Sequence, residues 1–230
     1  MKKKSVKREN AQKMLIEVSN DGPYLVSGKV PLQEQIIVSD SVGDAVGWRE
    51  GEKIENNDCY ALCRCGQSEN KPFCDGSHAI VGFDGTETAD RRQYVEQAEL
   101  TRGPNLTLAD AQPLCAGGRF CDAAEGTWQM VEQSGDPVAA KLAIEQACNC
   151  PSGRLTVYDK NGKAIEPELK PSIGVVSEEV TGENGPLWVR GGIPVKSVDG
   201  KTYEVRNRVT LCRCGNSCNK PFCDAHHSDG

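Results

Sequence analysis

The chain contains few aromatic residues and no excess of basic ones. Only 5% of its 230 residues are aromatic and 37% are hydrophobic, so one large apolar core is not expected. Acidic residues outnumber basic ones by 33 to 27, and the net charge of -6 argues against nucleic acid as a partner. We therefore expect several small units, held together by something in addition to apolar burial.

Long apolar runs are also missing. No stretch approaches 18 consecutive apolar residues, and the basic start, MKKKSVKR, is not followed by an apolar segment. We therefore expect no membrane span and no secretory signal, and we interpret residues 1–20 as a solvated basic tail of a cytoplasmic protein. Twelve cysteines in such a chain favour metal ligation over disulfides, because the cytosol keeps thiols reduced.

Two segments of the sequence are repeated. The pattern Gly-Pro-x-x-Val-x-Gly-x-aliphatic-Pro occurs at residues 22–31 and again from Gly185, and a cysteine-rich pattern follows each copy. The repetition predicts two similar units, at residues 21–83 and 177–230. Each is expected to contain a short strand, a turn, a second strand and a loop that carries metal ligands.

A different unit, residues 84–176, separates the two copies. Its segment 136–147 (DPVAAKLAIEQA) predicts a helix, because Asp136 is placed to cap it, Pro137 suits the first turn and apolar residues fall on one stripe. The alternating residues on both sides of Asn161 predict a β-hairpin. We therefore expect a small unit that mixes helix and sheet.

Each repeated cysteine pattern has the spacing C-x-C-x8-C-x3-H. The third cysteine and the histidine are four residues apart, so on a helix they share a face and can hold one metal ion. The first two cysteines need a turn to bring both thiolates to one side. The spacing therefore predicts two ligand pairs, which suits a two-iron cluster, with a Cys3His zinc ion as the alternative. The ligands are Cys63, Cys65, Cys74 and His78, and Cys212, Cys214, Cys223 and His227.

The sequence around these ligands resembles the CDGSH iron-sulfur (mitoNEET-like) family, whose motif is C-x-C-x2-S/T-x3-P-x-C-D-G-S/A/T-H. The first copy has the motif residue at every position. The second keeps the four ligands, but Ala225 and His226 replace the glycine and the small residue, which bears on the turn and adds His226 as an alternative ligand. The resemblance implies a [2Fe-2S] cluster in each copy, with the C-x-C cysteines on an inner iron and the C-x3-H pair on an outer one.

The resemblance also implies a fold. Family members with one motif per chain form homodimers in which strands of both chains build a shared β-cap. Because this chain has both motifs, we expect an α+β protein in which two small β-rich CDGSH units pair as an internal pseudo-dimer with a β-cap. The middle unit would be a small ferredoxin-like α+β insert, and the chain would be a monomer.

The middle unit has a cysteine group of its own: Cys115, Cys121, Cys148 and Cys150. Cys150 precedes a proline just after the expected helix, as a ligand does in bacterial ferredoxins. The segment resembles a divergent ferredoxin domain with one 4Fe-4S cluster. Three interpretations remain open: a three- or four-iron cluster with or without Cys148, a set of reduced thiols, or a disulfide.

Four residues of the repeat units remain to be interpreted. Cys59 and Cys218 receive no role. Arg64 and Arg213 lie between cluster cysteines, and they either favour the reduced state of the cluster by their charge or are solvated.

The sequence shows no nucleophile–base set, phosphate loop or substrate motif, so we do not expect an enzyme. We expect a protein that carries single electrons through two [2Fe-2S] clusters, with an unidentified redox partner or apo-acceptor protein and with neither nucleic acid nor a membrane. The alternatives are a carrier that hands on its cluster, a sensor of redox state or pH, and a structural zinc protein. Imidazole must be neutral to bind a metal and free histidine titrates at about pH 6.5, so protons compete with iron for the histidines.

Overall fold

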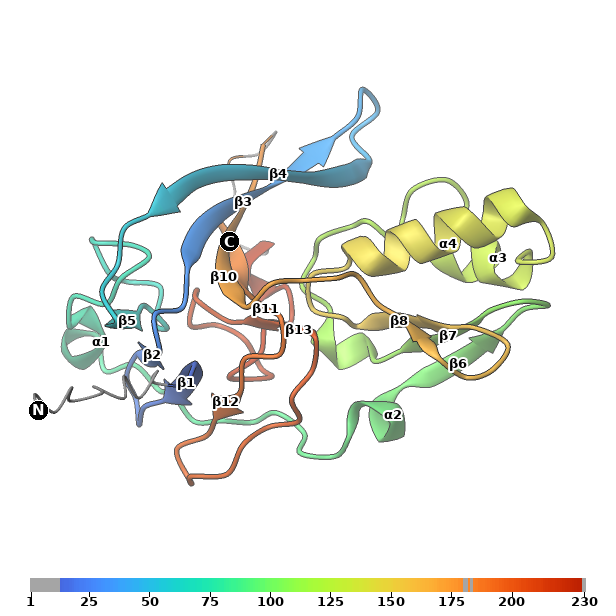
Figure 1. The fold of residues 1–230 in the computed structure, drawn as a ribbon. Coiled ribbons are helices and arrows are strands. Elements are labelled where there is room, and N and C mark those ends of the chain that lie inside the picture. Colours follow the sequence, from blue (N-terminus) through green and yellow to red (C-terminus); the bar gives the residue numbers. More distant parts are fainter. Residues whose placement is uncertain (1–12, 180–181, 183, 229–230) are drawn as a thin grey trace, which may run out of the picture.

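The computed structural model describes residues 13–179, 182 and 184–228 (Figure 1). In this part of the chain the strands form three small sheets, and the longer helices belong to the middle unit. The fold is α+β, as predicted. No helix among these residues combines the length and the apolar character that are needed to cross a bilayer.

The first repeat unit consists of five strands and a short helix that follows the ligand loop. These are β1 (Leu15–Val18), β2 (Tyr24–Ser27), β3 (Leu32–Ser39), β4 (Ala45–Ile54), β5 (Cys59–Leu62) and α1 (Ser77–Ile80). The second repeat unit is shorter. It contains β10 (Ser172–Glu178), β11 (Asn184–Arg190), β12 (Val195–Lys196), β13 (Arg208–Leu211) and the 3-10 helix η2 (His226–Ser228).

The two repeat units exchange one strand each. β12 of the second unit pairs in parallel with β1 of the first, and β3 of the first pairs in parallel with β10 of the second. The sheets therefore have the matching orders β5-β2-β1-β12 and β13-β11-β10-β3, the latter extended by β4. This exchange is the predicted internal pseudo-dimer, and the two sheets form its shared β-cap.

One apolar core lies between the two sheets. It takes fully buried side chains from both repeat units, among them Ile16, Leu32 and Leu62 from the first and Ile173, Leu187 and Leu211 from the second. Burying an aliphatic side chain of this size stabilises a fold by about 1.5–3 kcal/mol. Neither unit can keep this core without the other.

Two boundaries differ from the expected ones. β1 lies inside the segment 1–20 that we expected to be a tail, because its alternating side chains bury Ile16 and Val18 in the shared core. β10 starts inside the segment expected for the middle unit, because it pairs with both β11 and β3. The remaining part of the expected tail, residues 1–12, falls outside the described residues.

The middle unit packs two helices on one face of a four-stranded antiparallel sheet, as Figure 1 shows. The sheet has the order β6-β7-β8-β9. Small apolar side chains of the longer helix, Ala139, Ala143 and Ala147, let it approach the sheet closely. The elements are α2 (Tyr94–Gln97), β6 (Glu99–Arg102), β7 (Thr107–Asp110), η1 (Gln112–Leu114), α3 (Thr127–Glu132), α4 (Pro137–Asn149), β8 (Leu155–Tyr158) and β9 (Ala164–Ile165).

Both local predictions for the middle unit are confirmed. The helix α4 starts at Pro137, and the side chain of Asp136 caps it by accepting the Val138 N–H at 3.0 Å. β8 and β9 form the hairpin around the predicted turn. The carboxylate of Asp159 holds this turn by accepting the backbone N–H of Lys163 at 2.9 Å.

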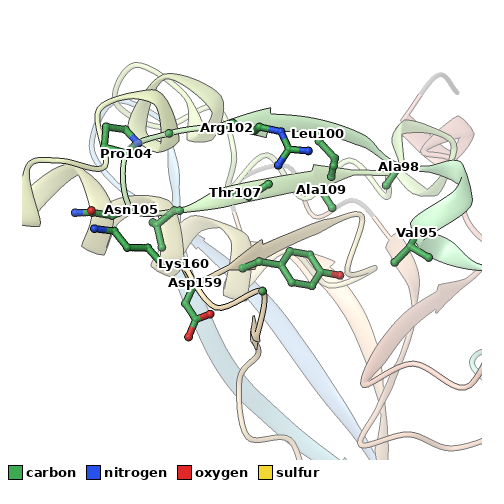
Figure 2. Close-up of a pocket in the computed structure, with 14 residues that line it drawn as sticks. Val95, Ala98, Leu100, Arg102, Pro104, Asn105, Thr107, Ala109, Asp159 and Lys160 are labelled. Carbon is green, nitrogen blue, oxygen red and sulfur yellow. The ribbon is translucent and has the colours of Figure 1, made fainter.

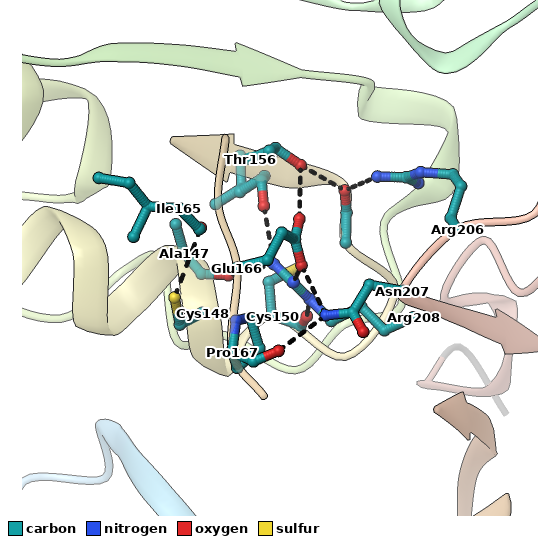
Figure 3. Close-up of polar contacts among 12 residues, drawn as sticks. Ala147, Cys148, Cys150, Thr156, Ile165, Glu166, Pro167, Arg206, Asn207 and Arg208 are labelled. Carbon is teal, nitrogen blue, oxygen red and sulfur yellow. Dashed lines mark hydrogen bonds and ion pairs between the residues drawn. The ribbon is translucent and has the colours of Figure 1, made fainter. Parts of the chain in front are cut away.

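A buried arginine joins the middle unit to the second repeat unit. The guanidinium of Arg208, on β13, is 1% exposed and donates hydrogen bonds to the carbonyl oxygens of Cys150, at 2.8 Å, and Ala147, at 2.9 Å (Figure 3). It also pairs with the carboxylate of Glu166. In the first repeat unit the equivalent position is Cys59, so only the second unit has this attachment.

Arg208→Met is expected to lower the free energy of unfolding by about 3–5 kcal/mol, because it leaves Glu166 without its buried partner and several carbonyl oxygens without donors. Urea unfolding followed by circular dichroism measures the change. The control is Arg49→Met: Arg49 pairs with Glu179 at 2.6 Å, but both side chains are about half exposed. That pair should contribute less than about 1 kcal/mol. Equal losses in the two variants would contradict the structural role of Arg208.

Candidate metal centres

The first centre lies where strand β5 ends. Cys63 follows this strand directly, and its Sγ lies 3.8 Å from that of Cys65. Sγ of Cys74 lies 3.4 Å from Nδ1 of His78, on helix α1. With metal–ligand distances of about 2.0–2.3 Å, two ligands of one tetrahedral ion lie about 3.3–3.8 Å apart. The side chains therefore form two pairs, each spaced to hold one metal ion.

The second centre has the same geometry. Sγ of Cys212 lies 3.6 Å from that of Cys214, and Sγ of Cys223 lies 3.4 Å from Nδ1 of His227. His226, the alternative ligand, points elsewhere: its Nδ1 lies 2.9 Å from a carboxylate oxygen of Asp224. The structure therefore pairs His227 with Cys223.

The motif residues that are not ligands shape the loop. The N–H of Cys63 donates to the carbonyl oxygen of Pro72 at 2.8 Å, and the Ser68 hydroxyl donates to that of Phe73 at 2.6 Å. Corresponding bonds recur in the second loop, from Cys212 to Pro221 at 2.9 Å and from Ser217 to Phe222 at 2.7 Å. Both loops thus place their ligands by the same backbone scaffold.

An aspartate fixes the turn before each histidine. The hydroxyl of Ser77 donates to Asp75 at 2.6 Å, and the N–H groups of Ser77 and Glu69 donate to it at 3.0 and 2.8 Å. These bonds, that of the hydroxyl first, hold the pKa of Asp75 well below its usual range. Asp75 is therefore a charged structural anchor.

The residue after this aspartate has a left-handed backbone conformation in both loops. Gly76 has φ 93° and Ala225 has φ 71°. The second copy thus keeps the turn although alanine replaces glycine. For a residue with a Cβ, this left-handed conformation costs about 1–2 kcal/mol of folding free energy.

Ala225→Gly is therefore expected to raise the free energy of unfolding by about 1 kcal/mol, and Gly76→Ala to lower it by a similar amount. A Cβ at Gly76 would have no atom within 4 Å, so the cost is that of the backbone alone. Thermal unfolding of both variants measures the changes. The control, Ala79→Gly in helix α1, should destabilise, because glycine is a poor helix former. If Ala225→Gly lowers the free energy of unfolding as the control does, the backbone of Ala225 is not strained.

The two C-x-C loops lie against each other. A Cβ atom at Gly66 would collide with the carbonyl oxygen of Cys214, and one at Gly215 would collide with that of Cys65. Both glycines are left-handed, with φ 79° and 87°. The inner sides of the two centres therefore face each other across the pseudo-two-fold axis.

Buried positive charge accompanies the buried thiols. Arg64 is 1% exposed and Arg213 is 8% exposed, so neither is solvated. Burial lowers the pKa of Arg213 to about 10. Attraction by the Cys63 and Cys214 sulfur atoms acts in the opposite direction and raises this pKa. Arg213 belongs to the second repeat unit and Cys63 to the first. Arg213 therefore places one buried positive charge close to a cysteine of each centre.

The thiols of the second centre are unequal in acidity. Their mutual hydrogen bond lowers the pKa of Cys212 and raises that of Cys214, so the two thiols share a proton. Burial raises the pKa of Cys223 to about 12. Metal binding must therefore displace protons here, and the affinity of this centre for a metal should fall as the pH falls.

Three of the four cysteines in the middle unit come together. Cys115, Cys121 and Cys150 line one cavity with Arg154. Sγ of Cys148 instead lies 3.8 Å from the carbonyl oxygen of Ile165, on the side of β9 (Figure 3). None of the twelve cysteines, which all lie among the described residues, forms a disulfide in the structure. Cys148 is therefore separated from the other three cysteines, which line the cavity together.

The three-thiol cavity lies beside the second centre. Repulsion from Cys115 is among the causes that raise the pKa of Cys223. The loop 116–118, between two of the middle cysteines, lines a cavity together with His227. The side-chain amide of Asn219 also donates to the carbonyl oxygen of Pro113 at 2.9 Å. The middle unit thus contacts the ligand loop of the second repeat unit. One sequence difference between the repeats points to the second unit: position 208 is an arginine, whereas the equivalent position of the first copy is a cysteine.

The middle unit also has an open cavity on the opposite face of its sheet, away from the cysteines. It has a volume of about 400 Å³ and is lined by apolar side chains such as Leu100 and Val95 and by charged ones such as Arg102 and Lys160 (Figure 2). None of the predicted ligands contributes to its wall.

The two matched Cys3His centres in paired β-units, with a three-thiol cavity beside one of them, have the residue types and the pairing that an iron-sulfur protein needs. Comparison with family models agrees. Residues 21–79 and 184–228 match the family described as iron-binding zinc finger, CDGSH type, and residues 101–160 match the divergent 4Fe-4S mono-cluster family. The chain thus carries two CDGSH-type domains that flank a divergent 4Fe-4S domain, which confirms the resemblance. A search of curated proteins finds no match.

Proposed function

We propose that the protein binds a [2Fe-2S] cluster in each repeat unit and passes single electrons between these clusters and a partner protein. The ligands would be the four side chains of each centre described above. The observation that carries the proposal is their pairing: 3.8 and 3.4 Å within the pairs of the first centre, and 3.6 and 3.4 Å in the second. Two pairs suit a cluster with two irons and two ligands on each.

The contact between the two C-x-C loops supports electron transfer. Because Gly66 and Gly215 press on the opposite loop, the inner irons would lie on either side of this contact. Three of the four thiols there, those of Cys63, Cys65 and Cys212, are buried, and that of Cys214 is partly exposed. A close approach of two redox centres within one chain is an arrangement that would favour the passage of an electron between them.

The proposal includes a third cluster, of three or four irons, on Cys115, Cys121 and Cys150. These cysteines share one cavity, and the loop 116–118, between Cys115 and Cys121, lines another cavity with His227 of the second centre. The three centres would then form a series, with the second centre in the middle. The proposed protein is a monomer that passes electrons and turns over no substrate of its own.

The test is anaerobic purification with iron and sulfide counts beside the electron paramagnetic resonance spectrum of the reduced protein. Two [2Fe-2S] clusters account for about four irons per chain, and a third cluster adds about three or four. Dithionite should bleach the colour reversibly. A colourless protein with bound zinc would contradict the proposal in favour of a structural zinc protein. Light scattering at the chain mass of 24.9 kDa would support the monomer.

Cluster transfer is the second candidate, favoured by the exposure of the first centre. Its outer pair, Cys74 and His78, is partly exposed, whereas its inner pair is buried. Ile80 follows on the same helix and is 88% exposed, which suits contact with an acceptor protein. Transfer of iron from the purified protein to an apo-ferredoxin, slowed by His78→Cys, would favour this candidate, and a cluster that cycles with a reductase without loss of iron would favour electron transfer.

A further inference from the structure

The second ligand loop differs from the first at two positions that lie together in space. Cys218 occupies the position of Glu69, and His226 occupies that of Ser77. In both loops the backbone N–H groups of these two positions donate to the central aspartate; in the second loop Asp224 accepts them at 2.7 and 3.3 Å. The shared scaffold therefore brings both replaced side chains to one carboxylate.

The side-chain atoms converge there. The thiol of Cys218, a carboxylate oxygen of Asp224 and a ring nitrogen of His226 all lie within 4.8 Å of one another. Nδ1 of His226 already lies 2.9 Å from Oδ2 of Asp224. The loop is held in place from outside as well, because the Thr88 hydroxyl donates to the carbonyl oxygen of Cys218 at 2.7 Å. Only small movements separate this arrangement from the spacing of ligands on one ion.

A thiolate, an imidazole and a carboxylate are the ligand set of a borderline divalent cation such as zinc, whereas magnesium and calcium prefer oxygen alone. Thiolate and carboxylate together balance the two charges of such an ion. Cys218 and His226 are exposed and Asp224 is partly exposed, so an ion can enter from solvent and keep a water ligand. We propose that Cys218, Asp224 and His226 form a mononuclear site for a zinc-like divalent cation, distinct from the cluster ligands and independent of the proposed function.

The experiment adds Zn²⁺ to the iron-loaded protein under anaerobic conditions, removes excess zinc by gel filtration, and measures zinc, iron and the zinc K-edge absorption spectrum. The expected result is about one additional zinc per chain, with sulfur and nitrogen ligands and with the iron count unchanged. Cys218→Ser and His226→Ser should each weaken zinc binding more than about tenfold. Even the loss of a residue that only hydrogen-bonds to a metal ligand lowers the metal affinity by about 10–100-fold.

His226→Ser keeps the loop intact, because serine is the residue of the first copy. Cys59→Ser, at another exposed cysteine, is the matched control and should bind zinc as the parent does. The reciprocal pair Glu69→Cys with Ser77→His should create a second zinc site on the first loop. Zinc uptake with loss of iron, or zinc binding retained in both ligand variants, or no zinc bound by the parent, would each overturn the proposal.

Discussion

His78→Cys is expected to slow the acid loss of the first cluster by about tenfold or more and to lower its reduction potential by on the order of 100 mV. Neutral imidazole is a weaker ligand for iron-sulfur clusters than thiolate, and free imidazole takes up a proton at about pH 6.5. A protonated ring nitrogen cannot bind iron, so protons compete with iron for the imidazole, and cluster loss should accelerate as the pH falls. The anionic thiolate adds negative charge, which makes the cluster harder to reduce.

The measurement is the decay of visible absorption at a series of pH values, with a redox titration of each variant. His227→Cys should have the same effects on the second cluster, because His227 is paired with Cys223 in the same way. His226→Ser is the control: its ring faces Asp224, so acid loss should be unchanged. A decay rate at pH 5 to 6 that His78→Cys leaves unchanged would refute proton competition at this ligand.

Cys150→Ser is expected to remove about three or four irons per chain and leave about four, whereas Cys148→Ser should remove none. The two cysteines are neighbours in sequence, but Cys150 lines the three-thiol cavity and Cys148 faces the carbonyl oxygen of Ile165. A serine at position 150 removes a thiolate ligand, and the remaining two cannot hold the cluster. Iron and sulfide counts measure the loss, and the spectrum of the two [2Fe-2S] clusters serves as the internal reference.

Each outcome of this comparison assigns a role. Equal iron loss in Cys148→Ser and Cys150→Ser would show four ligands and contradict the three-thiolate centre. About four irons in the unsubstituted protein would instead show that the middle thiols are a reduced set without a cluster. The cysteines cannot be ranked by spacing alone, because Cys148 and Cys150 lie on either side of the end of helix α4, where the chain changes direction.

The attachment of the middle unit makes the two repeat units unequal. Arg208 joins β13 to the backbone of Cys150, and the loop 116–118 lines a cavity together with His227. At the corresponding place the first unit has the exposed Cys59. The second centre is thus placed between two neighbours, while the outer ligands of the first remain partly exposed. For the proposed electron transfer, this arrangement favours entry or exit of electrons at the first centre.

The amino-acid sequence by itself determined the pairing of the eight candidate ligands in the two repeated centres, the helix at 136–147 and the hairpin at Asn161. Each depends on residues close together in the chain. A C-x-C turn, a C-x3-H pair on a helix and an aspartate cap bring their groups into contact through local geometry, so spacing and residue type are enough to predict them.

Only the tertiary structure decided how these parts are combined. The exchange of β3 and β12, the place of β1 in a sheet, the burial of Arg64, Arg213 and Arg208, and the separation of Cys148 from its neighbours all depend on contacts between distant segments. A short strand such as β1 carries no signal of its partner, and an arginine carries none of its burial. Their positions follow from which surfaces can be buried together, a property of the whole chain.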